Sequence, residues 1–290
     1  MPSPNCPPRL YKYFAPERSN LLGSSLLRHT PLGAFNDPFE GLPDVTMLST
    51  DEQALKSFTE LLPQEAKATY DALDAQVRAA LPFPAFLNLL QAFTQAKQPE
   101  ILQQFRALTG SVVGFIHKKF DEHVGALCLS EVPDSLLMWS HYGASHTGFV
   151  VEFDAHHPHF HEQRSAEDDF RHLRRVLYRE ARPSAPLTDM EAPELFLVKS
   201  GHWAYEREWR ILRALSEAAT VVPAEPFPLH LFTFPREVVT AVILGARSTS
   251  ATEITLRQDL RTHGEFKAVR LKRALPDPAH FMLRMIDEEI

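Results

Sequence analysis

The most informative segment of this chain is YEREWRIL, which occupies residues 205–212. It places two carboxylates, Glu206 and Glu208, directly before a run of apolar, β-prone residues. Side chains alternate between the two faces of a strand, so a strand here would point both glutamates to one side and Arg207 to the other. Like charges on one face repel and cost stability unless a partner or a chemical role compensates. The segment therefore predicts a buried strand that begins at a functional site.

The composition is that of an ordinary globular protein. The chain has 290 residues, of which 44% are hydrophobic and 23% are charged. This length is enough for one large domain, or for a core domain with an insertion. The net charge of −7 and the pI near 6.1 argue against a broad nucleic-acid-binding surface, although they leave room for a local basic groove.

The cysteines and the apolar runs indicate the cellular setting. Cys6 and Cys128 cannot form a disulfide framework, and neither has the spacing of a metal site. No apolar run approaches the roughly 18 residues that a bilayer-spanning helix needs, and residues 1–8 lack the features of a signal peptide. We therefore expect a soluble cytoplasmic protein with no membrane partner.

The hydrophobic patterning predicts an α+β fold. Residues 51–124 are rich in Ala, Leu and Gln, with apolar positions at helical spacing, which predicts a helical insertion into a single domain of residues 1–290. Elsewhere the strands are short and do not alternate regularly with helices, which favours α+β over a doubly wound sheet. The predicted strands are 10–14, 125–131, 149–153, 176–178, 208–215, 229–234, 238–244 and 266–271, and the helices predicted outside the insertion are 21–27, 135–142, 193–201 and 250–263.

Three further segments carry residues that could line a cleft. Ser130 would end a buried strand, and the helix after it carries Tyr142; this serine could equally serve as a turn or a helix cap. Residues 36–40, NDPFE, are typical either of a turn held by an Asn or Asp side chain or of a rim over a ligand. Lys199 could place a cation near the paired glutamates and relieve their repulsion.

Several common kinds of site are missing from the sequence. No Gly-x-Ser-x-Gly motif surrounds Ser130, which argues against nucleophilic serine catalysis. The chain has only 11 glycines and no glycine-rich phosphate loop, which excludes P-loop and Rossmann sites. The histidine-rich run 156–161 is broken by Pro158 and has no cysteine nearby, so we expect a surface loop there and no metal site.

Six short motifs occur in order along the chain. They are YKY at 11–13, FNDPFE at 35–40, CLSE at 128–131, MWSHY at 138–142, WAYEREWR at 203–210 and VILG at 242–245. Together they resemble the bacterial family labelled domain of unknown function twenty-nine seventy-one, over nearly the whole chain outside the helical insertion. The label itself carries no function.

A more distant resemblance concerns the order of the elements. A strand with a basic residue, a helix, a strand with a serine, a helix with a tyrosine and a late strand with a glutamate follow one another. This order resembles the ADP-ribosyltransferase superfamily, and the late strand is similar to its DNA-targeting toxins. The resemblance implies a split, mixed or antiparallel sheet core. It also implies an NAD-consuming toxin or antiviral defence effector that modifies a macromolecule, either protein or nucleic acid.

The same resemblance assigns roles to eight residues. Glu208 would be the catalytic glutamate, and Glu206 would complete the pair. Lys12, with Tyr11 beside it, would hold the ribose or a phosphate of NAD. The other implied NAD-binding residues are Ser130 on the middle strand, Tyr142 against the nicotinamide, and Asn36 and Asp37 in the loop.

The implied chemistry suits these side chains. Cleavage of the nicotinamide–ribose bond develops an oxocarbenium-like cation, as glycoside cleavage does. The Glu208 carboxylate could stabilise that charge, while Glu206 orients or deprotonates the acceptor. NAD would thus be a substrate. Two alternatives stay open: a non-catalytic module that recognises a nucleotide or a partner, and a metal-dependent hydrolase or nuclease that uses Asp37, Glu40 and the glutamate pair.

Overall fold

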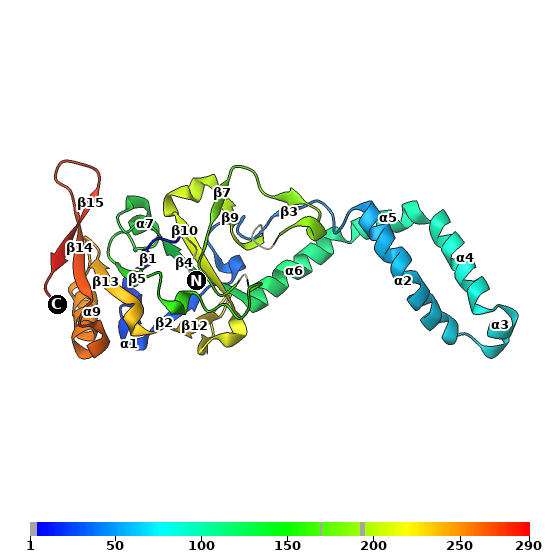
Figure 1. Ribbon diagram of the computed structural model, residues 1–290. Coiled ribbons are helices and arrows are strands. Elements are labelled where there is room, and N and C mark those ends of the chain that lie inside the picture. The colour runs from blue at the N-terminus through cyan, green and yellow to red at the C-terminus, as the bar shows by residue number, and fades with distance from the viewer. Residues whose placement is uncertain (1–4, 169, 192–194) are drawn as a thin grey trace. The chain divides into compact units, whose positions relative to one another are not determined.

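The structure is a computed structural model that describes residues 5–168, 170–191 and 195–290 (Figure 1). The chain divides into two compact units. The described residues of unit 1 are 5–42, 119–168, 170–182 and 195–290, and those of unit 2 are 43–118 and 183–191. All eight predicted site residues belong to unit 1.

Unit 1 is built on an eight-stranded sheet with the order β15-β14-β13-β5-β1-β4-β10-β6. Neighbouring strands run antiparallel except β13 and β14, which are parallel. Helix α9 (Ser250–Thr262) forms the crossover that two parallel strands require. The strands are β1 (Arg9–Phe14), β4 (Val124–Ser130), β5 (Phe149–Asp154), β6 (Arg174–Arg175), β10 (Glu208–Ala214), β13 (Val239–Leu244), β14 (Arg270–Pro276) and β15 (Leu283–Glu288). A mixed α/β fold with a mixed sheet is thus confirmed.

Both faces of this sheet carry buried side chains. Val151 and Trp209 belong to the larger apolar core on one face, whereas Val150 belongs to a smaller core on the other, as strand alternation requires. Helix α7 (Leu136–His141) covers this second face, where Trp139 packs edge-on against Tyr13 with ring centroids 5.3 Å apart. The sheet therefore forms the interior of unit 1.

The sheet opens between β1 and β4. These two strands share a single register pair, Tyr11 with Ser130. By contrast, β1 pairs with β5 at six positions and β10 pairs with β4 at seven. Beyond the shared pair, a side chain takes the place of backbone hydrogen bonds between the two strands. The ammonium of Lys12 donates to the Cys128 carbonyl at 2.9 Å. The divergence leaves room for side chains between the two strands.

Smaller elements surround the main sheet of unit 1. A three-stranded antiparallel sheet has the order β11-β12-β2, and β7 and β9 form a parallel pair. Their bounds are β2 (Leu26–His29), β7 (Leu177–Arg179), β9 (Val198–Ser200), β11 (Thr220–Val222) and β12 (Leu229–Thr233), and the short helix α1 (Leu21–Ser24) lies near α9.

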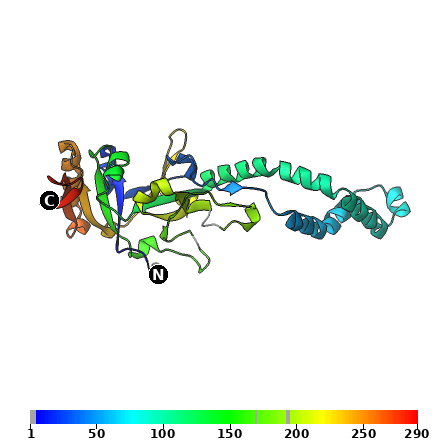
Figure 2. The same cartoon turned by 90° about the horizontal axis from the view of Figure 1, so that it is seen from above.

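Unit 2 consists mainly of helices. They are α2 (Asp51–Asp71), α3 (Ala75–Ala80), α4 (Phe83–Ala96), α5 (Gln98–Ala107) and the first part of α6 (Thr109–His123), with the two-stranded pair β3 (Asp44–Val45) and β8 (Ser184–Ala185). Helices α2 and α4 lie side by side (Figures 1 and 2). A capping box starts α2, because Thr50 and Gln53 each accept from the other's backbone amide.

The helix predicted for 193–201 was only partly right, since residues 195 and 196 are helical. Residues 192–194 lie outside the described residues, and Val198–Ser200 forms strand β9 instead of a helix. The parallel partner β7 supplies hydrogen bonds to this short segment, and such a tertiary partner overrides local helix propensity. Strand β15 was not predicted, and β14 begins four residues later than the predicted strand at 266.

Across the described ranges 5–168, 170–191 and 195–290, no helix combines the length and apolar character needed to cross a bilayer.

His29 makes the stability of unit 1 sensitive to acid. Its side chain is buried on β2 with its ring 4.1 Å from that of Phe232. Burial, and then the positive charge of Arg213, hold the pKa of His29 well below its usual value of about 6.5. The folded protein thus keeps this imidazole neutral at a pH where the unfolded chain binds a proton.

We expect the free energy of unfolding to fall as pH drops below about 6.5, with His29 contributing up to about 1.4 kcal/mol per pH unit. Urea titrations at pH 7.5, 6 and 5 would measure this slope. His29→Leu should reduce it, whereas His123→Leu, at an exposed position, should leave it unchanged. Equal slopes for the wild type and His29→Leu would contradict the prediction.

Candidate functional site

One cavity of about 320 Å³ lies where β1 and β4 diverge. Its wall brings together segments that are distant in the sequence, from β1, β2, β4, the loop before residue 37, α7 and the segment 199–208. Of the eight predicted site residues, seven line it: Tyr11, Lys12, Asn36, Ser130, Tyr142, Glu206 and Glu208.

Strand register explains how three of these residues meet. Ser130 on β4 is opposite Tyr11 on β1 and opposite Glu208 on β10. Directly paired residues of antiparallel strands present their side chains on the same face. A row of Tyr11, Ser130 and Glu208 therefore crosses three neighbouring strands at the end of the cavity.

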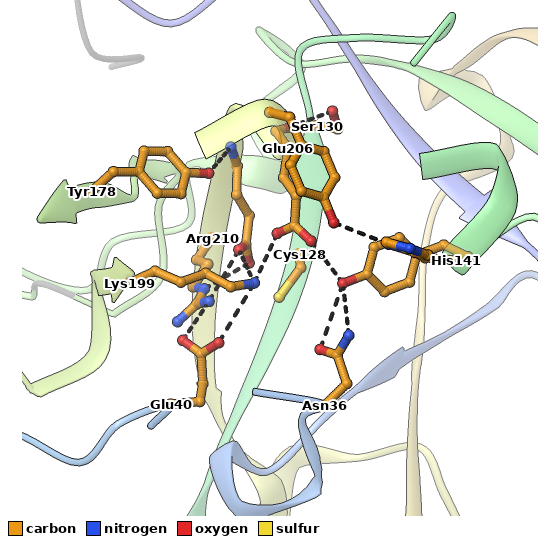
Figure 3. Close-up of polar contacts among 12 residues, drawn as sticks. Asn36, Glu40, Cys128, Ser130, His141, Tyr178, Lys199, Glu206 and Arg210 are labelled. Carbon is orange, nitrogen blue, oxygen red and sulfur yellow. Dashed lines mark hydrogen bonds and ion pairs between the residues drawn. The ribbon is translucent and has the colours of Figure 1, made fainter. Parts of the chain in front are cut away.

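A single ammonium group binds three carboxylates beside this row (Figure 3). The Nζ atom of Lys199 lies 2.7 Å from Glu206 Oε2, 3.2 Å from Glu208 Oε2 and 3.5 Å from Glu40 Oε2. All four side chains are buried. The predicted role of Lys199, to relieve repulsion within the glutamate pair, agrees with this geometry.

Arg210 is the second cation of the ionic cluster (Figure 3). Its Nε donates to Glu208 Oε1 at 2.7 Å and its Nη2 to Glu208 Oε2 at 3.0 Å, which is a bidentate arrangement. Its Nη2 also lies 2.7 Å from Glu40 Oε1. Two cations, Lys199 and Arg210, thus face three carboxylates in an environment from which water is largely excluded.

The two glutamates of the pair differ in their electrostatics. Burial raises the pKa of Glu208, but the charges of Arg210 and Lys199 outweigh it and hold this pKa well below its usual value. Burial dominates at Glu206, so its pKa is raised despite Lys199. Burial also raises the pKa of Glu40. Glu208 is therefore a fixed anion, whereas Glu206 is the carboxylate that is readier to take a proton.

The pair does not lie on one strand, so the predicted same-face geometry was wrong. Glu206 ends the 3₁₀ turn Gly201–Glu206, and Glu208 is the first residue of β10. Between them Arg207 adopts the left-handed conformation, with φ of 44°. This turn, and not strand alternation, aims both carboxylates at Lys199. The amide of Glu208 then donates to the Tyr178 hydroxyl at 2.8 Å.

Ser130 and Tyr142 hold Glu206 in place. The Ser130 hydroxyl donates to the Glu206 carbonyl at 2.6 Å and accepts from the Val132 amide at 3.1 Å, so it supports the turn. The Tyr142 hydroxyl donates to Glu206 Oε1 at 2.7 Å and accepts from Asn36 Nδ2 at 3.1 Å. Hydrogen bonds thus fix both the backbone and the carboxylate of Glu206.

Asp37 is the predicted site residue that does not line the cavity. Its Oδ1 accepts from the Phe39 amide at 2.9 Å, which is the turn-holding role weighed from the sequence. Glu40, three residues later, reaches the ionic cluster instead. Sequence reasoning placed Glu40 in the 36–40 segment and in the alternative metal site, and it gave Arg210 no role in the site. The position of Arg210, two residues after Glu208 on one strand, was the available signal for their contact.

Cys128 also lines the cavity, on β4 opposite Arg210. Burial, and then the negative charge of Glu208, raise the pKa of its thiol far above the ordinary value. A thiol must ionise to attack or to bind a metal. Cys128 is therefore a neutral wall residue.

Comparison with protein families bears on part of this site. Residues 138–211 match the family described as protein of unknown function, DUF2971. The family resemblance is confirmed over this segment. The matched segment contains Tyr142, Lys199, Glu206 and Glu208. Lys12 and Ser130, which also line the cavity, lie outside it. No curated protein and no solved structure matches the chain.

Lys199→Met tests the ionic cluster. Removal of the ammonium leaves three buried carboxylates with Arg210 alone, and breaking such a cluster costs about 3–5 kcal/mol. We expect that loss in the free energy of unfolding at pH 8, with partial recovery at pH 5, because Glu206 and Glu40 have raised pKa values and take up protons in the folded state.

Lys97→Met is the matched control, since Lys97 pairs with Glu100 on an exposed helix, and it should cost less than about 1 kcal/mol at either pH. Urea denaturation measures both variants. A Lys199→Met protein as stable as the control would show that the cluster is not what holds the site.

Arg207→Gly tests the left-handed turn. A non-glycine residue in this conformation costs about 1–2 kcal/mol, and glycine avoids that cost while gaining freedom in the unfolded chain. We expect the variant to be as stable as the wild type or up to about 1 kcal/mol more stable in thermal unfolding. Arg261→Gly, in the regular helix α9, should lose about 1 kcal/mol. Equal losses for the two variants would refute the role of the turn.

Proposed function

We propose that this chain is an NAD-dependent ADP-ribosyltransferase or NAD glycohydrolase. The observation that carries the proposal is the convergence of the implied residues: Lys12, Ser130 and Glu208 come from three neighbouring strands, and with Tyr142 they line one cavity. These residues are separated by up to 196 positions in the sequence. Their convergence supports the functional resemblance.

The sheet gives further support to an ADP-ribosyltransferase-like fold. The strands with the basic residue, the serine and the glutamate occupy consecutive places as β1, β4 and β10. The divergence of β1 from β4 after one register pair accords with a split sheet, and the cavity lies at this split. Its volume of about 320 Å³ falls within the range of small-molecule sites, which supports its use for the nicotinamide–ribose end of NAD.

The contacts favour different roles for the two glutamates. Both oxygens of Glu208 accept hydrogen bonds from Arg210, and one also accepts from Lys199. Each oxygen of Glu206 accepts a single bond, one from Tyr142 and one from Lys199. A carboxylate offers about four acceptor sites. Glu206 therefore has capacity left for a substrate hydroxyl, while Glu208 supplies a fixed negative charge behind it.

The proposed reaction follows from these roles. The bond between ribose C1′ and the nicotinamide nitrogen breaks, and nicotinamide leaves with the electron pair. The negative charge of Glu206 and Glu208 stabilises the ribosyl cation. A lone pair of the acceptor, water or a macromolecule, forms the new bond to C1′. The acceptor proton passes to Glu206, whose raised pKa suits a general base.

One observation favours a second function. Because Arg210 and Lys199 already neutralise Glu208, the cavity could bind a nucleotide without cleaving it, as a sensor module would. A metal-dependent hydrolase has less support. Lys199 lies between the three carboxylates, at the place a metal ion would need.

Nicotinamide release from NAD distinguishes these functions. We expect the wild type to consume NAD and Glu206→Gln to lower kcat by about 10²–10⁴-fold, because the substitution keeps the shape of the side chain but removes the base. Glu237→Gln, at an exposed position, is the control. If Glu206→Gln turns over like the wild type, the catalytic assignment is wrong. NAD binding without nicotinamide release in the wild type would support the sensor function.

The proposed role as a toxin or antiviral effector has a cellular test. Expression of the wild type in a bacterium should arrest growth and deplete NAD or modify a macromolecule, and Glu206→Gln should relieve the arrest. If the wild type and Glu206→Gln arrest growth equally, the toxicity does not come from the proposed reaction.

A further inference from the structure

A cluster of cations lies on the side of the cavity formed by β1 and β2. Lys12 and Arg28 line the cavity, and Arg18 lies near them, donating from its Nη2 to the Leu26 carbonyl at 3.3 Å. Burial lowers the pKa of Lys12, and the charges of Arg28 and Arg18 lower it further. Arg18 likewise lowers the pKa of Arg28 after burial does. Three positive groups are therefore held close enough to repel one another.

No carboxylate pairs with these three cations within the described parts of the chain. The hydrogen bond of Lys12 is to the Cys128 carbonyl, which leaves two of its three ammonium protons available. The Nε of Arg28 is buried and has no hydrogen-bond partner among the described residues. Glu208, whose charge acts on Lys12, is already held by Arg210 and Lys199. Buried donors without acceptors are costly unless a ligand satisfies them.

Cations outnumber carboxylates among the side chains of the cavity wall, the ionic cluster and Arg18. Five cations, namely Lys12, Arg18, Arg28, Lys199 and Arg210, accompany three carboxylates, namely Glu40, Glu206 and Glu208. Two positive charges therefore remain in excess, in a chain whose net charge is −7. Among the described residues, Lys12, Arg18 and Arg28 are the cations of this set without a carboxylate partner, whereas Lys199 and Arg210 are both paired. An anionic group with more than one charge would balance the excess.

We propose that Arg28 joins Lys12, which the superfamily resemblance already assigns to the ribose or a phosphate, in a phosphate-binding subsite, so that the ligand of this cavity carries a phosphate or diphosphate group. A guanidinium fork binds two oxygens of a phosphate at once, and an ammonium adds a point charge beside it. Arg18 adds a positive charge nearby. The resulting cavity is bipolar, with phosphate held at Arg28 and a group that can meet a carboxylate held at Glu206.

As a description of substrate recognition the subsite rests on the proposed function, but anion binding can be measured without turnover. Isothermal titration of the wild type with inorganic pyrophosphate should show binding, and acetate should bind far more weakly. Arg28→Gln should weaken pyrophosphate binding at least about tenfold. Arg28→Lys, which keeps the charge but loses the fork, should bind more weakly than the wild type, and Arg261→Gln, at an exposed position on α9, should bind equally well.

Circular dichroism and thermal unfolding establish that each variant is folded, and if Arg28→Gln does not fold, Arg28→Lys decides. The subsite is refuted if the wild type binds pyrophosphate no better than acetate. It is also refuted if a folded Arg28 variant binds pyrophosphate like the wild type. Pyrophosphate binding that depends on Arg28, in a protein that never cleaves NAD, would support the subsite and refute the enzyme. If the protein releases nicotinamide but binds pyrophosphate independently of Arg28, the enzyme is supported and the subsite is refuted.

Discussion

The contact on which the site depends is the one between the Lys199 ammonium and the carboxylates of Glu40, Glu206 and Glu208. Buried carboxylates are tolerated when cations and hydrogen bonds compensate for lost hydration. Because the three acids come from a loop, a turn and a strand, their shared cation also fixes these three segments relative to one another within unit 1. The ionic contacts that form the site are therefore also contacts that hold the local fold together.

This arrangement gives unequal properties to two glutamates only two residues apart. Glu208 faces a bidentate guanidinium and remains charged, while Glu206 shares one ammonium and a tyrosine hydroxyl. Neighbouring carboxylates whose environments drive their pKa values apart are a common basis for dividing chemical roles. Here the division arises from Arg210, which contacts Glu208 and not Glu206.

Much of the framework could be predicted from local sequence. The strands of the sheet centre and helix α9 follow from hydrophobic patterning, and the glutamate pair was recognised because adjacent like charges before an apolar strand need a reason. Glu40 could not be placed, since its contacts with Lys199 and Arg210 span 159 and 170 positions in the sequence. The left-handed turn at Arg207 was also missed, because arginine carries no local signal for that conformation. Lys199 was assigned a helix because local propensity could not reveal its partner strand β7.

The side chains at the end of the cavity depend on the register of the sheet, because Tyr11, Ser130 and Glu208 are paired across three neighbouring strands. Alternation on a strand means that a slip of β10 by one residue would exchange every side chain between the two faces. Trp209, which now donates through its ring nitrogen to Glu131 at 2.8 Å, would then take the place of the charged carboxylate. A chain with this error would carry an indole where the native cavity has the Glu208 carboxylate, so Lys199 and Arg210 would lose one of the anions that they bind.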